Sequence, residues 1–151
     1  MRRALTVIAA CLALAACGDG DESSDPRTVV EVGGASVTAE VADDVPSRQR
    51  GLSGRDRLAP DAGMLFLEPN DSPQFWMKGM RFPIDIVWIR NGRVVDVTAD
   101  VPPPAGDNAP LPTYSPERPA NRVLEVNAGW AEDHGVERGD PVRVRETRAS
   151  G

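Results

Sequence analysis

Cysteine and histidine are nearly absent from this sequence. Its 151 residues include two cysteines, Cys11 and Cys17, and one histidine, His134. Both cysteines lie at the N-terminal end, so the chain after residue 17 has no thiol and no possible disulfide. That part must be stabilised by packing alone, and a cysteine metal site is excluded. We expect no cofactor and no resident metal.

Signatures of the common hydrolases are also missing. No Gly-x-Ser-x-Gly elbow and no His-Glu-x-x-His motif occurs. His134 lies in the last turn of a predicted helix, where a basic side chain complements the helix dipole. The sequence assigns no catalytic residue, which favours a protein that is not an enzyme.

Basic residues are in the minority. The chain has 17 lysines and arginines against 23 acidic residues, a net charge of −6. Without Arg2 and Arg3, 15 basic residues remain and the net charge is −8. An acidic surface excludes nucleic acid as a partner and an electrostatic grip on anionic lipid.

Long apolar runs are missing except near the N-terminus. Arg2 and Arg3 precede an apolar run at residues 4–14, which is too short to span a bilayer and fits a secretory signal peptide. The segment Leu14-Ala15-Ala16-Cys17 resembles the lipobox of bacterial lipoproteins. We expect a signal peptide at 1–16, lipid on Cys17 and an acidic tether at 17–27. An ordinary signal peptide is the alternative.

The remaining chain predicts one globular domain at 28–148, with a tail at 149–151. Short β-branched or alternating segments predict strands, separated by glycine, proline and Asn-Gly turns. They lie at 28–32, 36–42, 63–67, 74–77, 84–90, 93–101, 122–126 and 142–146. Short helices are expected at 44–52, capped by Asp44, and at 127–135, capped by Asn127. The fold class is mainly β with a minor α+β character: a small barrel-like or sandwich domain of about 7–8 short strands with two short helices.

The stretch 75–89 is the most apolar part of the domain. Ile84, Ile86 and Trp88 alternate with Asp85, Val87 and Ile89, so both faces of this strand are apolar and both should be covered. Asp85 is the exception, and a buried carboxylate needs a partner. We expect an ion pair with Lys78 or Arg81. The alternative is a pocket carboxylate with a shifted pKa.

A proline-rich loop follows this region. Residues 102–119 contain seven prolines, which exclude helix and central strand, and loops of this length are often functional. We expect Tyr114 in this loop to be exposed. With Trp76, Lys78 and Asp85 it is our candidate binding surface, although Trp76 and Trp130 are equally suited to anchor the core.

Six segments, in order along the chain, resemble the domain of unknown function 192 family. They are Arg50-Gly51-Leu52, Gly63-Met64-Leu65-Phe66, Phe75-Trp76-Met77-Lys78, Pro83-Ile84-Asp85, Leu124-Glu125-Val126-Asn127-Ala128-Gly129-Trp130 and Gly139-Asp140. The resemblance implies a compact β-barrel-like domain, often secreted or lipid-anchored, without an established activity or catalytic residues. The chain departs from the family at Ser53, where many members have Met, and at Gly79-Met80, where many have Asn-Thr.

Three functions remain open from the sequence. The leading hypothesis is a lipid-anchored, non-enzymatic binding module on the outer face of a bacterial cell membrane, with an envelope protein or glycan as partner. One alternative is a polysaccharide hydrolase that uses Asp85 and Glu125 as its carboxylate pair. The other is copper binding by the thioethers of Met64, Met77 and Met80.

Overall fold

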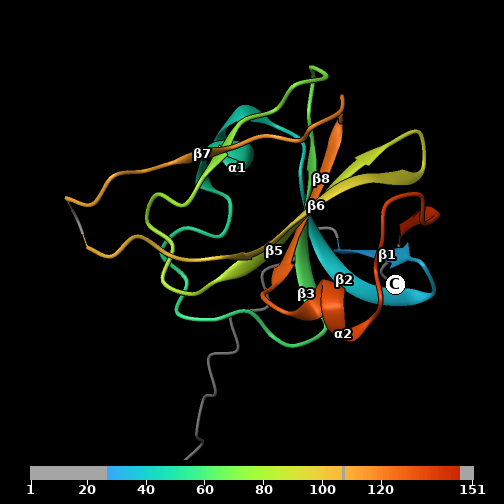
Figure 1. Cartoon of the computed structure of the whole chain (residues 1–151), viewed down its shortest axis with the longest axis horizontal. Coiled ribbons are helices and arrows are strands. Elements are labelled where there is room, and N and C mark those ends of the chain that lie inside the picture. The colour runs from blue at the N-terminus through green and yellow to red at the C-terminus, as the bar shows by residue number, and fades with distance from the viewer. Residues whose placement is uncertain (1–26, 107, 147–151) are drawn as a thin grey trace, which may run out of the picture.

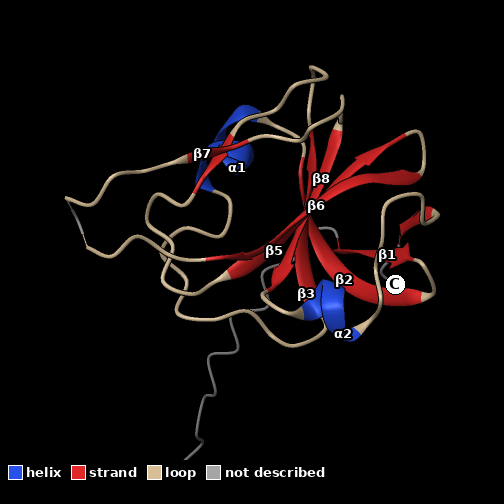
Figure 2. Cartoon of the chain, viewed as in Figure 1, coloured by secondary structure: helices blue, strands red, loops and turns tan. Residues whose placement is uncertain are grey.

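A computed structural model describes residues 27–106 and 108–146 of the protein; the predicted signal peptide, Cys17 and most of the tether lie outside the described residues. The described part is mainly β, with nine strands and two short helices (Figure 2). The strands are β1 Arg27–Val32, β2 Ala35–Ala42, β3 Ala62–Leu67, β4 Phe75–Trp76, β5 Ile84–Arg90, β6 Arg93–Val101, β7 Thr113–Tyr114, β8 Arg122–Asn127 and β9 Val142–Glu146, and the helices are α1 Val45–Arg50 and α2 Trp130–Asp133. No helix in these ranges is long and apolar enough to cross a membrane.

Seven strands form one curled sheet in the order β6-β5-β8-β3-β2-β1-β9 (Figure 1). All neighbours are antiparallel except β2 and β3. The two end strands approach each other at one end, where a bridge joins Arg93 to Pro141 and the Val142 N–H donates to the Gly92 carbonyl at 2.8 Å. The sheet is therefore a half-barrel, as expected from the sequence.

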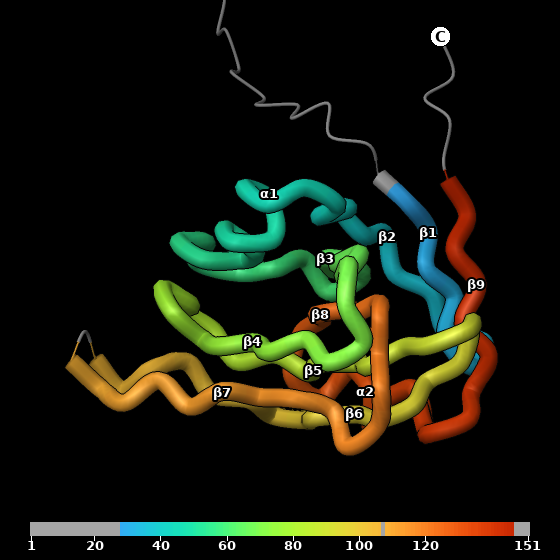
Figure 3. The backbone as a smooth tube through the Cα atoms, turned by 90° about the horizontal axis from the view of Figure 1, so that it is seen from above, coloured from blue at the N-terminus to red at the C-terminus, as the bar shows by residue number. Residues whose placement is uncertain are grey.

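The strand count exceeds the expected 7–8 because the proline-rich loop contributes a short strand of its own. Residues Thr113–Tyr114 pair with Phe75–Trp76 to form a separate two-stranded sheet, β4-β7. In Figure 3 this pair lies beside one end of the half-barrel, with the proline-rich segment extending beyond it. The loop is thus tied back to the domain along part of its length.

Strand β5 separates two apolar clusters and is buried on both faces, as predicted. Val87 and Ile89 face the cluster inside the curl, which also contains Trp130 of α2. Ile84, Ile86 and Trp88 face a second cluster on the other side of the sheet, beneath α1 and the β4-β7 pair. Each face of the central strands is therefore covered by a different layer.

Helix α1 begins as the sequence predicts and α2 does not. Asp44 caps α1: its side chain accepts from the Ser47 N–H at 2.7 Å, and the Ser47 hydroxyl lies 3.2 Å from the Asp44 N–H. Asn127 was expected to cap α2, which is wrong. Asn127 ends β8 and donates to the carbonyl of Ala59, while Gly129, with a φ of 83°, occupies the N-cap of α2.

The predicted ion pair of Asp85 is also wrong. Asp85 is fully buried, and its carboxylate accepts from three backbone N–H groups: Asp100 at 2.9 Å, Gly129 at 3.2 Å and Ala131 at 2.9 Å. Arg81 instead pairs with Asp56 on the surface. The Asp100 N–H is available because the β5–β6 pairing is irregular beside Asp85. Asp85 therefore joins β5, β6 and the start of α2.

We expect Asp85→Ala to lower the free energy of unfolding by about 2–5 kcal/mol, because three buried N–H groups would lose their acceptor. Asp85→Asn retains one acceptor oxygen and should cost less. Urea unfolding monitored by circular dichroism measures both changes. Asp56→Ala is the control, since its exposed ion pair contributes at most about 1 kcal/mol. Equal losses in Asp85→Ala and Asp56→Ala would contradict the role assigned to Asp85.

Candidate functional site

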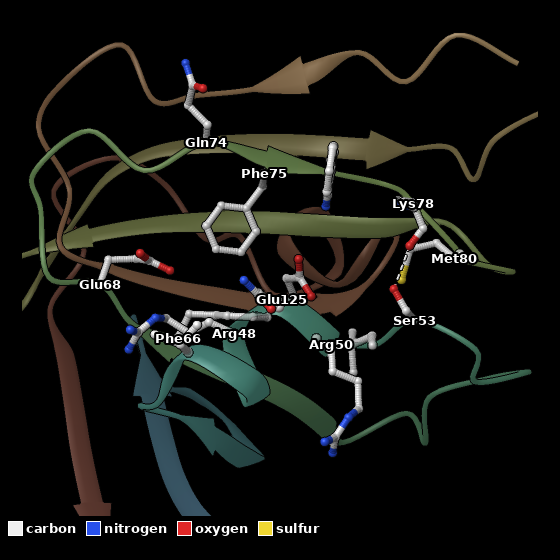
Figure 4. Close-up of a pocket in the computed structure, with 16 residues that line it drawn as sticks. Arg48, Arg50, Ser53, Phe66, Glu68, Gln74, Phe75, Lys78, Met80 and Glu125 are labelled. Atoms are coloured by element: carbon white, nitrogen blue, oxygen red, sulfur yellow. Dashed lines mark hydrogen bonds between the residues drawn. The ribbon is translucent and has the colours of Figure 1, made fainter.

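A pocket of about 690 Å³ opens on the second face of the sheet, between α1 and β4 (Figure 4). One wall comes from α1 and the turn that follows it, residues 48–53. The opposite wall comes from residues 74–76 and 78–80, and the floor from β3 and β8. A pocket of this volume suits a small organic ligand.

Glu125 on β8 lies at the floor of this pocket. It pairs in register with Ile86 on β5 and Met64 on β3, so its side chain points to the second face of the sheet. Only 6% of Glu125 is exposed, and its carboxyl forms no hydrogen bond with any residue of 27–106 and 108–146. Figure 4 shows the carboxyl at the centre of the pocket. Burial raises the pKa of Glu125 from 4.5 to about 8, so the group is largely neutral at pH 7.

One wall of the pocket is aromatic and firmly held. The ring of Phe75 packs edge-on against Phe66, with centroids 4.9 Å apart, and against Trp88 at 5.7 Å. Trp76, the next residue, is 57% exposed. The Lys78 ammonium lies 5.4 Å from the Trp76 ring centroid, a cation–π contact that restrains this exposed ring.

Two hydrogen bonds close the wall at the end opposite Glu68. The Ser53 hydroxyl donates to the Lys78 carbonyl at 2.6 Å, as Figure 4 shows, and the Gly54 N–H donates to the Gly79 carbonyl at 2.8 Å. The chain must pass close to Phe66 here. Gly51 has a φ of 51°, and a Cβ at this position would lie 3.4 Å from the Phe66 ring. Glycine at 51 therefore fits both the backbone and the pocket floor.

Charged side chains surround the aromatic wall. Arg48 donates to the carbonyls of Asp43 at 2.6 Å and Leu67 at 3.1 Å, which fixes α1 to the end of β3. Burial raises the pKa of nearby Glu68, and the charge of Arg48 opposes that rise. Arg50 and Lys78 border the pocket, are exposed, and form no ion pair within the described part of the chain. In Figure 4 the Arg50 guanidinium points away from Glu125.

The structure brings together two of the four residues of the predicted binding surface. Trp76 and Lys78 line the pocket. Asp85 lies on the opposite face of the sheet, since it is in register with Val126 rather than Glu125. Tyr114 pairs with Phe75 across β4-β7 and is half-buried against the second cluster, so the expectation that it is exposed is wrong. The alternative that both Trp76 and Trp130 anchor the core is confirmed for Trp130, which is buried, and is wrong for Trp76, which is exposed.

The three methionines considered for copper belong to one cluster. Met64, Met77 and Met80 are all buried in the second cluster, and Met80 reaches the pocket. No group of three or more His, Cys, Asp or Glu side chains suited to a metal ion occurs in residues 27–106 and 108–146. His134 packs on Trp130, and its Nδ1 lies 2.8 Å from the Trp130 carbonyl, so it serves the end of α2.

Known proteins can be compared with this fold and pocket. The family model DUF192, described as "Uncharacterized ACR", matches residues 28–144. The chain belongs to the DUF192 family. No curated protein matches it.

Two solved structures resemble the DUF192 chain. A protein of unknown function from Novosphingobium aromaticivorans is 30% identical, with a TM-score of 0.67 over 78% of this chain and 83% of the other. A Sinorhizobium meliloti protein described as a "putative transcription regulator" is 29% identical, with a TM-score of 0.68 over 79% and 92%. Neither description names a substrate.

The pocket gathers most of the segments that carry the family resemblance. Four of the six contribute to its lining: 50–52, 63–66, 75–78 and 124–130. The positions at which this chain departs from the family pattern, Ser53, Gly79 and Met80, line it as well. Sequence reasoning missed Arg50, Glu68 and Ser53 as site residues, although the ordered segments were a signal that could have pointed to Arg50.

We expect the stability of the DUF192 chain to fall as the pH rises from about 4.5 to about 8. In this window the folded protein retains the Glu125 proton, which the unfolded chain releases at its ordinary pKa of 4.5. The slope contributed by Glu125 is at most about 1.4 kcal/mol per pH unit, and it disappears above about pH 8. Glu125→Gln should remove that contribution and leave a more stable protein at pH 8.

Urea unfolding of the wild type and Glu125→Gln at several pH values measures the difference. The comparison cancels the titration of other groups, which both proteins share. Parallel stability curves from pH 4.5 to 8 would show that the Glu125 carboxyl is not desolvated in the folded protein.

Proposed function

We propose that this DUF192 protein binds a saccharide of the cell envelope, without catalysing a reaction, in the pocket above Glu125. The observation that carries the proposal is the Glu125 side chain, which is 6% exposed, has no hydrogen-bond partner in the described part of the chain, and is directed into an open pocket. A buried polar group without a partner is costly, and such groups in native proteins call for an explanation. A ligand hydroxyl or carboxylate would supply the missing partner.

The rest of the lining supports a sugar. The C–H face of a pyranose ring packs well on an exposed aromatic ring, and Trp76 is half-exposed and restrained by Lys78. A neutral carboxyl both donates and accepts hydrogen bonds, as sugar hydroxyls require.

Two alternatives keep some support. The first is a hydrolase, but not one based on Asp85 and Glu125, because these side chains lie on opposite faces of the sheet. Glu68 is the second carboxylate of the pocket, and with Glu125 it would be the pair for acid–base chemistry. Cu(I) binding is favoured only by the burial of Met64, Met77 and Met80 in one cluster.

We also propose that the chain is exported and anchored to the outer face of the membrane by lipid on Cys17, which would place the pocket among envelope glycans. Nucleic acid is not part of the proposal. The net charge of −6, from 17 basic and 23 acidic residues, opposes the binding of polyanionic nucleic acid.

We expect Trp76→Ala to weaken saccharide binding at least about tenfold, because the ligand would lose its stacking surface. A glycan array of neutral and acidic bacterial oligosaccharides would identify ligands, and isothermal titration calorimetry would measure the dissociation constants. Leu111→Ala is the matched control: Leu111 is an exposed apolar residue of the proline-rich loop outside the pocket.

Each result of this experiment distinguishes the pocket from its rivals. If Leu111→Ala loses saccharide binding and Trp76→Ala retains it, the binding site lies on the proline-rich loop and not in the pocket. No saccharide bound at millimolar concentration would end the saccharide proposal. Tight binding in a Cu(I) titration, absent in Met80→Leu, would favour the methionines, and cleavage of a bound glycan would favour a hydrolase.

The lipid anchor has its own test. In bacterial cells fed radiolabelled palmitate, the wild-type protein should be labelled and found in the membrane fraction, and Cys17→Ser should be neither. An unlabelled wild-type protein in the soluble envelope fraction would support an ordinary signal peptide instead.

A further inference from the structure

The mouth of the pocket has the opposite charge to the chain as a whole. Arg50 at the end of α1 and Lys78 after β4 are exposed beside the pocket and form no ion pair within the described ranges. The Arg50 guanidinium points away from Glu125 in Figure 4, so this exposed side chain must change rotamer to meet a ligand, a common event on binding. Arg48 and Glu68, the other charged pair at the wall, offset each other. In a chain of net charge −6, this leaves two cations at the mouth of one pocket. Such a local excess attracts anions.

The floor of the pocket suits an anion for a different reason. Ionised Glu125 would repel an anion, but the neutral carboxyl can donate its O–H to one. Its strand neighbours are apolar, so none of them competes for that proton: Met64 on β3 and Ile86 on β5. The charged groups that surround it are those of the walls: Arg48 and Arg50 on α1, Glu68 after β3, and Lys78 after β4.

We infer that the pocket selects an acidic saccharide, with the sugar carboxylate hydrogen-bonded to the Glu125 side chain and its charge balanced by Arg50 and Lys78. The inference rests on the proposed saccharide function and names the class of sugar. The sugar carboxylate accepts the Glu125 O–H, so a single proton lies between two carboxyl groups. An acid–carboxylate hydrogen bond of this kind is among the stronger ones. The sugar ring then lies against Trp76.

A carboxylate fits this arrangement better than a phosphate. The floor supplies one acidic proton and the wall supplies two unpaired cations on opposite sides, from α1 and from the segment after β4. A phosphate monoester carries up to two charges and three terminal oxygens, which a single buried donor leaves mostly unsatisfied. The experiment includes a sugar phosphate to separate the two sources of negative charge.

The test compares a neutral disaccharide with its uronic acid, and both with a sugar phosphate. Isothermal titration calorimetry on the full-length protein in detergent would use cellobiose, cellobiouronic acid and glucose 6-phosphate. At pH 6 we expect the uronic acid to bind at least about tenfold more tightly than cellobiose. This preference should decline as the pH rises past about 8, where Glu125 ionises. Binding at pH 8 should take up protons, which buffers of different ionisation enthalpy detect.

Variants assign the preference to residues. Glu125→Gln should bind the uronic acid with an affinity that no longer depends on pH between 6 and 9. Arg50→Gln and Lys78→Gln should each reduce the preference for the uronic acid over cellobiose about threefold or more. Arg143→Gln, which removes another exposed cation, on β9, is the control. It should change neither the affinity for the uronic acid nor the affinity for cellobiose.

The outcomes separate this inference from the proposed function. Equal affinity for cellobiose and the uronic acid would overturn the acidic preference and leave saccharide binding intact. If the protein binds none of the tested sugars and no glycan on the array, the acidic preference and the saccharide function are both overturned. Tighter binding of glucose 6-phosphate than of the uronic acid, or a pH profile unchanged in Glu125→Gln, would overturn the assignment of a sugar carboxylate to Glu125.

Discussion

Burial of β5 and its neighbour β8 on both faces is the constraint on which the rest of the structure depends. Side chains on a strand that is covered on both faces do not contact solvent, so every charged group on it needs a partner inside the protein. Asp85 and Glu125 are the two carboxylates on these strands that are buried. They face opposite clusters, and they differ in whether the protein supplies hydrogen-bond donors to them. Backbone N–H groups surround Asp85, whereas none in residues 27–106 and 108–146 donates to the side chain of Glu125.

This contrast separates a structural carboxylate from a functional one. Asp85 satisfies a β-bulge and the beginning of α2, so its burial is compensated within the fold. Glu125 is equally enclosed by strands but opens toward a pocket, and nothing in the described chain compensates its burial. Ring contacts of Phe75 and the Ser53–Lys78 hydrogen bond already hold the aromatic wall and its rim, which limits the side-chain entropy that the protein must lose when a ligand binds.

The sequence predicts the strands much better than it predicts the site. The alternation of Ile84, Ile86 and Trp88 predicted both faces of β5, and Asn91-Gly92 predicted the hairpin that follows, because these signals are local. The partners of Asp85 are far away in sequence, at residues 100, 129 and 131, and a backbone N–H has no sequence signature. For the same reason the nearby Lys78 and Arg81 were better candidates than the groups that bind Asp85 in the structure.

The site was only partly predictable because register decides it. Trp76 ends β4 and Lys78 follows two residues later, so the two could be proposed together from the sequence. Whether Glu125 shares a face with Asp85 depends on which residue of β8 pairs with Asp85, and a shift of one residue would reverse the answer. Tyr114 was expected to be free because prolines surround it. To predict its pairing with Phe75, one would have to know that the loop returns to the domain.

The contact between the two end strands of the half-barrel bears on aggregation when such domains are present at high local concentration. Unpaired strand edges are templates on which other chains can add and aggregate. Here β6 and β9 shield each other at one end through the Arg93–Pro141 bridge, and the rest of β9 carries the charged side chains Arg143, Arg145 and Glu146. Charge along an edge opposes the addition of another strand. The half-barrel can therefore remain incompletely closed and still discourage association through its edges.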